Sequence, residues 1–337
     1  MLRIKIISCS IILILLSTGF GCSKKIIPPN NPLPITNKPS STTQKTNLPY
    51  QASSTELIDT LKSNVQPIAE GGVLVYKDIV YNKSSDGFKL LLDLYLPVST
   101  TKKILPAVVF IHGGGWMMDN KTHCQARDYL PQKDYAVACI DYRLSNVAKF
   151  PAQVYDIKAA VRWLRANANN YNIDPNHIGA WGDSAGGHLA SMLGVSGSTS
   201  DLEGSIGVSG YSSRVQAVVD WFGPTDFSQI IPLKDNFNEY YQAATQLLGS
   251  PLENNSELIK KASPLSYISS DDPPFLIMHG DADETVPYQQ SELFYNALKL
   301  TGVDVTYKLY PNNGHAFQEE KEFKTVLDFF DKHLKKN

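Results

Sequence analysis

The chain has 337 residues, of which 42% are hydrophobic and 19% charged, a composition typical of a globular protein with a large core. Its formal net charge of −2, with no cluster of Lys and Arg interleaved with aromatic residues, gives no electrostatic reason to expect a nucleic-acid partner. With only 22 Gly and 20 Pro, the chain is neither collagen-like nor disordered overall.

The N-terminus has the pattern of an export signal. Arg3 and Lys5 precede an apolar stretch over 6–16, which is shorter than the ~20 residues that cross a bilayer as a helix. Small residues and Cys22 follow, and this arrangement resembles a bacterial lipoprotein signal, in which the cysteine is lipidated. We expect residues 1–21 to be a signal peptide and the protein to be exported and anchored in a membrane through Cys22, at the cell surface or in the periplasm. Plain secretion and an uncleaved anchor are the alternatives.

The rest of the chain divides into a linker and one folded domain. Residues 22–66 are rich in Pro, Ser, Thr and Asn, which is typical of a flexible linker. Residues 67–337 alternate strand-like and helix-like segments and so predict an α/β domain, with a mostly parallel sheet and helices on both faces. Strands are predicted at 73–82, 88–97, 106–112, 135–142, 177–182, 215–222, 274–280 and 305–311, the first two as a hairpin. Apolar residues at helical spacing predict helices over 154–164 and 323–334.

Two cysteines fall within the predicted domain. Cys124 and Cys139 are able to pair in an oxidising compartment, but a disulfide cannot be derived from their spacing, and we expect two buried free thiols. Neither cysteine has the spacing of a zinc site, so no structural metal is expected.

A glycine-flanked serine stands between a predicted strand and a predicted helix, in the pentapeptide Gly182-Asp183-Ser184-Ala185-Gly186. Small neighbours are needed where the backbone turns so sharply that larger side chains would collide. This context predicts that Ser184 is a nucleophile. The alternative is a glycine-rich turn with an idle serine.

Three consecutive glycines follow His112 at the end of another predicted strand. Glycines let main-chain N–H groups point at a ligand, and donors aimed at the oxygen on which negative charge develops lower the barrier to acyl transfer. We expect the N–H groups of Gly114, Gly115 and Ala185 to form an oxyanion hole. A simple turn after the strand is the alternative interpretation.

A serine nucleophile also needs a base and an orienting acid, in the chain order Ser, Asp or Glu, His for this architecture. His315, directly after the last predicted strand, is the predicted base. The other six histidines are interpreted as structural or as wrongly placed for this role: His112, His123, His177, His188, His279 and His333. Asp283 is the predicted acid, ahead of Asp281, which we expect to stabilise the turn, and of Asp226.

These motifs resemble those of α/β-hydrolases of the hormone-sensitive-lipase-like esterase group, in which HGGGW, GDSAGGHLA, HGDADETVP and GHAF occur in this order. DYRL, FPAQVYD and WFGPTDF make the chain most similar to the branch that contains the bifunctional feruloyl and acetyl-xylan esterases. The resemblance covers about residues 70–337. It implies an α/β-hydrolase fold and a triad of Ser184, Asp283 and His315. It also implies an oxyanion hole formed by the second and third glycines with the residue after the nucleophile.

Two features bear on specificity. Segment 227–262, which contains several aromatic residues, precedes the strand that leads to the acid, and it is either a lid over the site or a packed surface helix pair. Trp116 and Trp221 are candidate substrate-binding residues, although both also fit a core position.

Together these features predict a carboxylesterase-type serine hydrolase that acts outside the cytoplasm and needs no cofactor or metal. By the resemblance, its substrates are acetyl or feruloyl esters of polysaccharides or of their fragments. A general small-ester or formamide hydrolase with the same triad is the nearest alternative. The alternative of another class is a lipoprotein that binds a ligand or partner on a hydrolase fold without catalysis.

Overall fold

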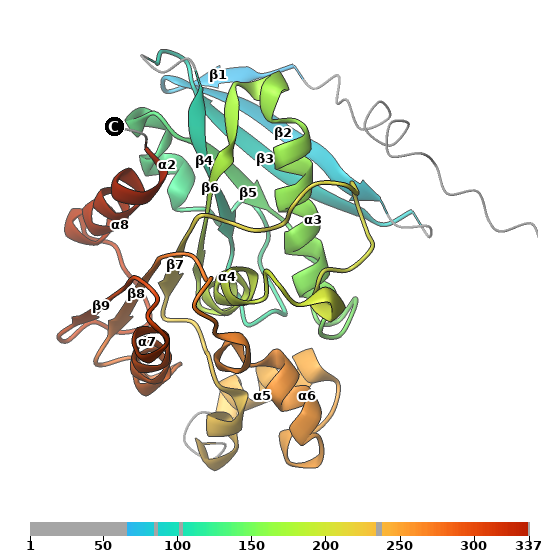
Figure 1. Ribbon diagram of the computed structural model, residues 1–337, viewed down its shortest axis with the longest axis vertical. Helices are drawn as coiled ribbons and strands as arrows, with labels where there is room; N and C mark the ends of the chain where they lie inside the picture. The colour runs from blue at the N-terminus through green and yellow to red at the C-terminus, as the bar shows by residue number, and fades with distance from the viewer. Residues whose placement is uncertain (1–65, 84–86, 101–103, 234–237, 336–337) are drawn as a thin grey trace, which may run out of the picture. The chain divides into compact units, whose positions relative to one another are not determined.

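The computed structural model describes residues 66–83, 87–100, 104–233 and 238–335, so the predicted signal peptide, Cys22 and almost all of the linker lie outside the described residues. Within these ranges, no helix combines the length and the apolar character that crossing a bilayer requires. The described residues form a nine-stranded sheet between helices, which confirms the predicted α/β fold (Figure 1).

The sheet begins antiparallel and continues parallel, in the order β1-β2-β3-β5-β4-β6-β7-β8-β9. Its antiparallel part comprises β1 (Ile68–Glu70), β2 (Val73–Lys83) and β3 (Lys89–Pro97), the last of which also pairs antiparallel with β5 (Ala136–Ile140). Its parallel part adds β4 (Leu105–Ile111), β6 (Ile173–Asp183), β7 (Ala217–Trp221), β8 (Phe275–Gly280) and β9 (Val305–Tyr310). The hairpin and all predicted strands are therefore confirmed, and only the short, exposed β1 was not predicted.

Helices cover both faces of the sheet, which explains why the central strand β4 is buried at every residue. Alternate residues of β4 enter two separate cores, with Val108 and Phe110 in one and Val109 and Ile111 in the other. The first core contains side chains of α2 (Ala126–Tyr129) and α8 (Glu320–Leu334). The second contains side chains of α3 (Ala152–Ala166), α4 (Ala185–Val195) and α7 (Gln289–Thr301). The two predicted helices are confirmed as parts of α3 and α8.

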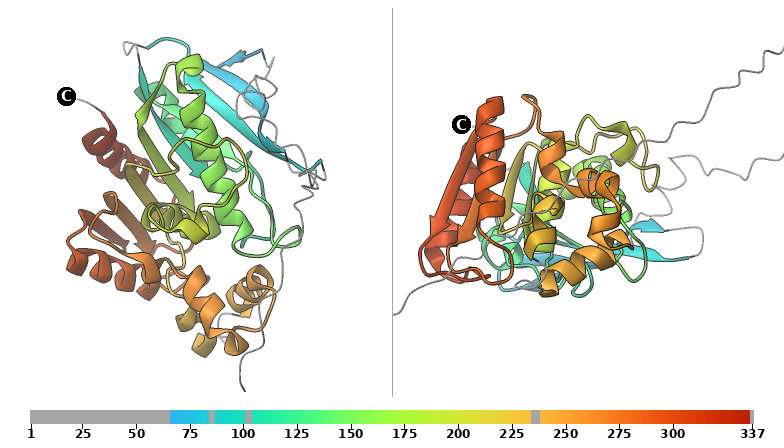
Figure 2. Two further views of the ribbon diagram at one scale, coloured as in Figure 1. Left: turned by 45° about the vertical axis from the view of Figure 1, so that its right-hand side comes forward. Right: turned by 90° about the horizontal axis from the view of Figure 1, so that it is seen from below.

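The predicted motifs gather where the parallel strands end. The glycine run follows β4 and Ser184 follows β6, while Asp283 and His315 follow β8 and β9. Because the carboxyl ends of parallel strands lie at one edge of the sheet, these distant segments of the chain meet there. The segment 227–262 forms α5 (Asn238–Leu248) and α6 (Ser256–Ala262), which lie together beyond the end of the sheet (Figures 1 and 2).

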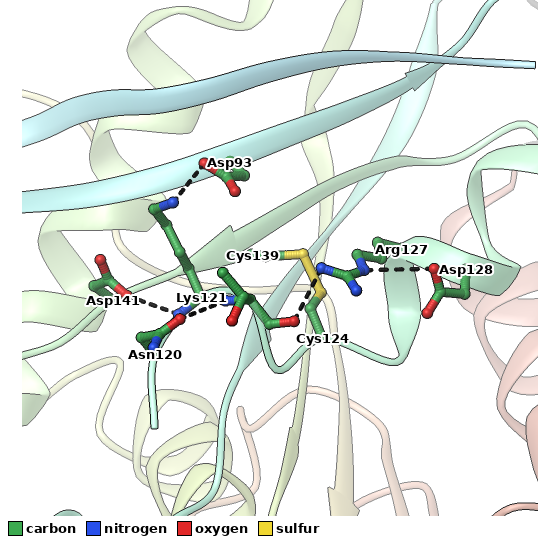
Figure 3. Close-up of a disulfide and its surroundings, with 9 residues drawn as sticks. Asp93, Asn120, Lys121, Cys124, Arg127, Asp128, Cys139 and Asp141 are labelled. Atoms are coloured by element: carbon green, nitrogen blue, oxygen red, sulfur yellow. Dashed lines mark hydrogen bonds and ion pairs between the residues drawn. A yellow bond between two sulfur atoms is a disulfide. The ribbon is translucent and has the colours of Figure 1, made fainter. Parts of the chain in front are cut away.

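Cys124 and Cys139 form a disulfide, so the expectation of two free thiols is wrong. Cys139 lies on β5, and Cys124 lies in the segment that runs from the glycine run to α2 (Figure 3). The same segment is held at Lys121, whose N–H donates to Asp141 at 2.7 Å and whose ammonium group lies 2.8 Å from a carboxylate oxygen of Asp93. The segment after the oxyanion glycines is therefore tied to the sheet both covalently and by ion pairing.

Candidate active site

Ser184 occupies a strained turn between β6 and α4. Its φ of 53° and ψ of −118° lie outside the regions that residues other than glycine commonly adopt. A Cβ atom on Gly182 would overlap the carbonyl group of Gly186, and a Cβ atom on Gly186 would overlap that of Ile111. The two flanking glycines are thus required by close backbone contacts, and the turn separates the serine hydroxyl from both the strand and the helix.

The side chains predicted as nucleophile, base and acid lie in one hydrogen-bonded chain. His315 Nε2 lies 2.8 Å from Ser184 Oγ, and His315 Nδ1 lies 2.6 Å from Asp283 Oδ2. Because an ionised carboxylate only accepts hydrogen bonds, Nδ1 carries the proton of the neutral ring, and Nε2 accepts from the serine hydroxyl. The structure therefore brings together all three residues that the sequence analysis selected.

The Asp283 carboxylate is surrounded by donors. Its Oδ1 accepts from the N–H groups of Thr285 and Val286, each at 2.8 Å, and its Oδ2 also lies 3.1 Å from His279 Nε2. Burial by itself raises the pKa of Asp283, but the hydrogen bonds from His279 and His315 outweigh burial and hold the pKa well below the ordinary value for Asp. The acid therefore stays ionised at neutral pH and can stabilise a positive charge on His315.

His279 is a site residue that the sequence analysis missed. Its side chain is fully buried, and Nε2 faces two acceptors, Asp283 Oδ2 at 3.1 Å and the carbonyl oxygen of Val286 at 2.9 Å. Nε2 therefore carries the proton, and Nδ1 accepts from the hydroxyl of Ser291 at 2.7 Å. In the sequence, His279 is marked only by its position four residues before Asp283. This spacing does not predict a contact unless the shape of the turn between the two residues is known.

Three main-chain donors border the nucleophile. Gly114 and Gly115 adopt φ values of 85° and 58°, which favour glycine, and Ala185 is the first residue of α4, where N–H groups have no acceptor within the helix. Among the hydrogen bonds of the described residues, none is donated by these three N–H groups. All three residues line the same pocket as Ser184. We call these N–H groups the oxyanion donors.

A pocket of about 360 Å³ opens over Ser184. Its lining includes the apolar residues Met117, Phe222 and Val286, to which α5 adds Tyr240 and Ala243 together with the carboxylate residue Glu239. Segment 227–262 therefore borders the site through α5, although its role as a lid stays a prediction. His123 and Asp183 form a polar wall of the same pocket.

The two predicted tryptophan contacts have different positions. Trp116 lines the pocket although it is almost fully buried, and its indole N–H donates to His188 Nδ1 at 3.2 Å. Trp221 is fully buried in the core that α8 covers and does not line the pocket, so its prediction as a substrate-binding residue is corrected. The next residue, Phe222, lines the pocket instead, with its ring centroid 4.5 Å from that of His315.

The remaining polar candidates have structural positions. Burial lowers the pKa of His112 and of His188 to about 4, so both rings are neutral at neutral pH. Asp281 accepts a hydrogen bond from the N–H of Asn312 at 2.6 Å, which agrees with its predicted role in the turn. Across the described ranges, no group of three or more His, Cys, Asp or Glu side chains is placed to hold a metal ion.

Asp183 stands out because it is buried and only partly compensated. Its Oδ2 lies 3.5 Å from His123 Nε2, whereas its Oδ1 has no hydrogen-bond partner among the described residues. Burial raises the pKa of Asp183 to about 6, although the nearby His123 and His315 act in the opposite direction. Because the folded state binds this proton more tightly than the unfolded chain does, the stability of the fold decreases as the pH rises from about 4 to about 6 and stays reduced above that range.

The chain matches known esterases. Residues 92–298 match the BD-FAE family. Esterase LipQ of Mycobacterium tuberculosis is 32% identical over 247 residues, which cover 71% of this chain and 56% of that protein. An acetylxylan esterase of Xylanibacter ruminicola is 26% identical over 245 residues, which cover 72% of this chain and 46% of that protein. The chain thus spans about half the length of the curated relatives it matches.

A solved structure shows the same fold over nearly its whole length. It is a truncated form of a carbohydrate esterase from gut microbiota, with a TM-score of 0.70 and 32% sequence identity. The match covers 79% of this chain and 99% of that one. The catalytic-domain architecture is therefore shared with a carbohydrate esterase.

The variant Asp183→Asn should stabilise the fold in a pH-dependent way. At pH 8 we expect its free energy of unfolding to exceed that of the wild type by up to about 3 kcal/mol, because the folded state no longer holds a buried charge. Below about pH 4 the gain should vanish, since Asp183 is then protonated in both states of the wild type. Urea unfolding at pH 4, 6 and 8 measures this, with the exposed Asp128→Asn as control. A gain that does not change with pH would contradict the raised pKa.

Proposed function

We propose that this chain, which belongs to the BD-FAE family, hydrolyses carboxylic esters and uses Ser184 as its nucleophile. The observation that carries the proposal is the hydrogen-bonded chain from Ser184 through His315 to Asp283, with the unpaired oxyanion donors beside the serine. The named esterases among the relatives support the same reaction class. A binding protein without activity would not need this arrangement.

The first half of the reaction forms an acyl-enzyme. His315 Nε2 takes the proton of Ser184 Oγ while that oxygen attacks the carbonyl carbon of the ester. The carbonyl oxygen becomes negatively charged, and the oxyanion donors stabilise it. Asp283 stays ionised, holds Nδ1–H of the ring and stabilises the imidazolium. The imidazolium then gives its proton to the leaving alcohol, and the carbonyl double bond forms again.

The second half releases the acid. A water molecule takes the place of the alcohol, and His315 removes its proton as the water attacks the acyl carbon. The oxyanion donors bind the second tetrahedral intermediate, and the protonated ring returns its proton to Ser184 Oγ as the carboxylic acid leaves. Every proton transfer passes through His315 Nε2, which lies in the described hydrogen-bonded chain, and no cofactor takes part.

For substrates, we propose acetyl or feruloyl esters of polysaccharides or of their fragments. The acetylxylan esterase and the carbohydrate esterase among the matches support this class. The pocket volume of about 360 Å³ lies within the range of small-molecule sites and suits a modest acyl group. General small-ester or formamide hydrolysis by the same triad is the second candidate.

The triad is tested by two substitutions and one probe. On an activated acetate ester, Ser184→Ala should lower kcat by ~10⁶, and Asp283→Asn should lower it by ~10⁴, because the three groups act as a unit. An organophosphonate should label the wild type on Ser184 alone and abolish its activity.

Asp281→Asn is the matched control for the acid, because Asp281 lies in the same loop and contacts Asn312 instead of His315. If Asp281→Asn is the more damaging change, the assignment of the acid is wrong. Labelling without loss of activity would refute Ser184 as the nucleophile.

We assign His279 the role of a positioning residue that acts through Asp283. Its removal in His279→Leu should lower kcat ~10- to 100-fold with little change in KM, because the carboxylate loses one of its charge-assisted donors. His279→Gln, which places an N–H group near the original Nε2, should recover most of this loss. Steady-state kinetics on both variants, with thermal unfolding to confirm folding, measures the effect. Equal losses in the two variants, or a loss confined to KM, would contradict the role.

We also propose that the protein is exported and anchored in a membrane through lipid on Cys22. The signal-like N-terminus supports export, and so does the disulfide between Cys124 and Cys139, because disulfides persist in oxidising compartments. A substrate outside the cytoplasm would agree with this location.

Expression of the full chain in a bacterium supplied with a labelled fatty acid tests the anchor. The label should appear on the wild type and disappear in Cys22→Ala, and the wild type should partition into the detergent phase. A soluble, unlabelled wild type that begins at another residue would indicate plain secretion.

A further inference from the structure

One polar side of the pocket takes no part in the triad chemistry. The side chain of Asp183 is only 9% exposed, yet it lines the pocket directly beside the nucleophile. Its Oδ1 has no hydrogen-bond partner among the described residues. Burying a carboxylate oxygen without a donor is costly, and such groups in proteins normally have a partner. The missing partner is therefore a feature of the site that needs an explanation.

The surrounding chain makes room for this carboxylate. A Cβ atom on Gly113 would lie 2.8 Å from Asp183 Oδ2, so the first glycine of the run allows the carboxylate to approach the backbone. On the other side His123 is held in place, because its Nδ1 lies 2.9 Å from a carboxylate oxygen of Asp119 and the next residue, Cys124, is joined to β5 by the disulfide (Figure 3). The segments that carry Asp183 and His123 are therefore held in place by contacts with the rest of the fold.

His123 does not satisfy Asp183 when its ring is neutral. Nδ1 faces the carboxylate of Asp119 and so carries the proton, which leaves Nε2 as an acceptor for the side-chain amide of Gln125 at 3.2 Å. In this form Nε2 has no proton to donate to Asp183 Oδ2, which lies 3.5 Å away. Oδ1 is closed off from the pocket, so Oδ2 is the oxygen of Asp183 that a donor supplied by a ligand can reach.

The position of the carboxylate indicates which part of the substrate meets it. The leaving oxygen of the ester must lie near His315 Nε2, because that atom protonates it. Asp183 lines the same pocket as His315, so an alcohol group held at Nε2 can extend toward the carboxylate. The apolar lining residues Met117, Tyr240 and Ala243 are then available to the acyl group.

We propose that Asp183, with His123 beside it, binds a hydroxyl group of the alcohol part of the substrate, on the carbon adjacent to the one that bears the esterified oxygen. This inference rests on the proposed esterase function. Sugars and other polyols carry a hydroxyl group at that place, whereas simple alkyl and aryl esters do not. The subsite therefore selects partly acylated polyols through a hydrogen bond that simple esters cannot make.

Three acetates of similar size test the subsite in the wild-type enzyme. These are 2-hydroxyethyl acetate, which carries the hydroxyl, 2-methoxyethyl acetate, in which it is blocked, and propyl acetate, which lacks it. We expect kcat/KM for the hydroxy ester to exceed both others by about 10- to 100-fold, because a buried charged acceptor left unpaired penalises the analogues. Equal values for the three esters would overturn the proposal.

Substitutions locate the preference. In Asp183→Ala the ratio of kcat/KM between the hydroxy and methoxy esters should fall to within about 3-fold of one. In His123→Gln it should fall by a smaller factor. Asp174→Ala is the matched control, since Asp174 lies on the same strand at its opposite end, where it pairs with His177, and the ratio should persist there. A ratio that persists in Asp183→Ala would overturn the assignment of the carboxylate.

The two levels of the proposal fail in different ways. Loss of selectivity among esters that are all hydrolysed would refute the subsite and leave the esterase function intact. No hydrolysis of any ester, together with no organophosphonate labelling of Ser184, would refute the function itself. Circular dichroism shows whether Asp183→Ala folds. If it does not, the comparison of the hydroxy and methoxy esters in the wild type still tests the subsite, because a carboxylate that binds a hydroxyl group must reject the methyl ether.

Discussion

The backbone turn at Ser184 is the constraint on which the rest of the site depends. Its unusual φ and ψ are held by close contacts at Gly182 and Gly186, the second of which lets α4 approach the end of β4. This approach brings the first N–H of the helix beside the glycine run, so that donors from two distant segments converge. The same turn thus exposes the hydroxyl and assembles the groups that stabilise its reaction product.

The acid connects this turn to the core on the other side of the site. Asp283 accepts from two main-chain N–H groups and from two histidines, of which His315 reaches the serine and His279 reaches Ser291 on α7. The carboxylate is therefore fixed by the fold before any substrate binds. A group fixed in this way stabilises charge on the ring without reorganisation, which is the main advantage of a preorganised site.

The features that the sequence predicted correctly are those that depend on short stretches of neighbouring residues and on their order in the chain. Apolar patterning located the strands, and turn chemistry with chain order selected Ser184 and His315, which the structure brings together. What the sequence did not reveal depends on proximity between distant segments, as for the disulfide and for the contact of His279 with the acid. The wrong prediction for Trp221 has the same cause. Whether a side chain of β7 lies in the core or at the pocket depends on the helices packed on each face of the sheet.

The two walls of the pocket differ in how they are supported, and this difference bears on specificity. Asp183 lies at the end of β6, the strand that leads to the nucleophile, and His123 precedes a cysteine that the disulfide joins to β5, so both residues of the polar wall lie on segments fixed to the sheet. Tyr240 and Ala243 belong to α5, in the segment between β7 and β8, which supplies no member of the triad. Part of the acyl side can therefore vary with that segment, whereas Asp183 on the polar side cannot change without altering the strand that ends at the nucleophile. A ligand hydroxyl that donates to Oδ2, the oxygen of Asp183 that is not closed off from the pocket, would offset part of the stability lost by burying this carboxylate.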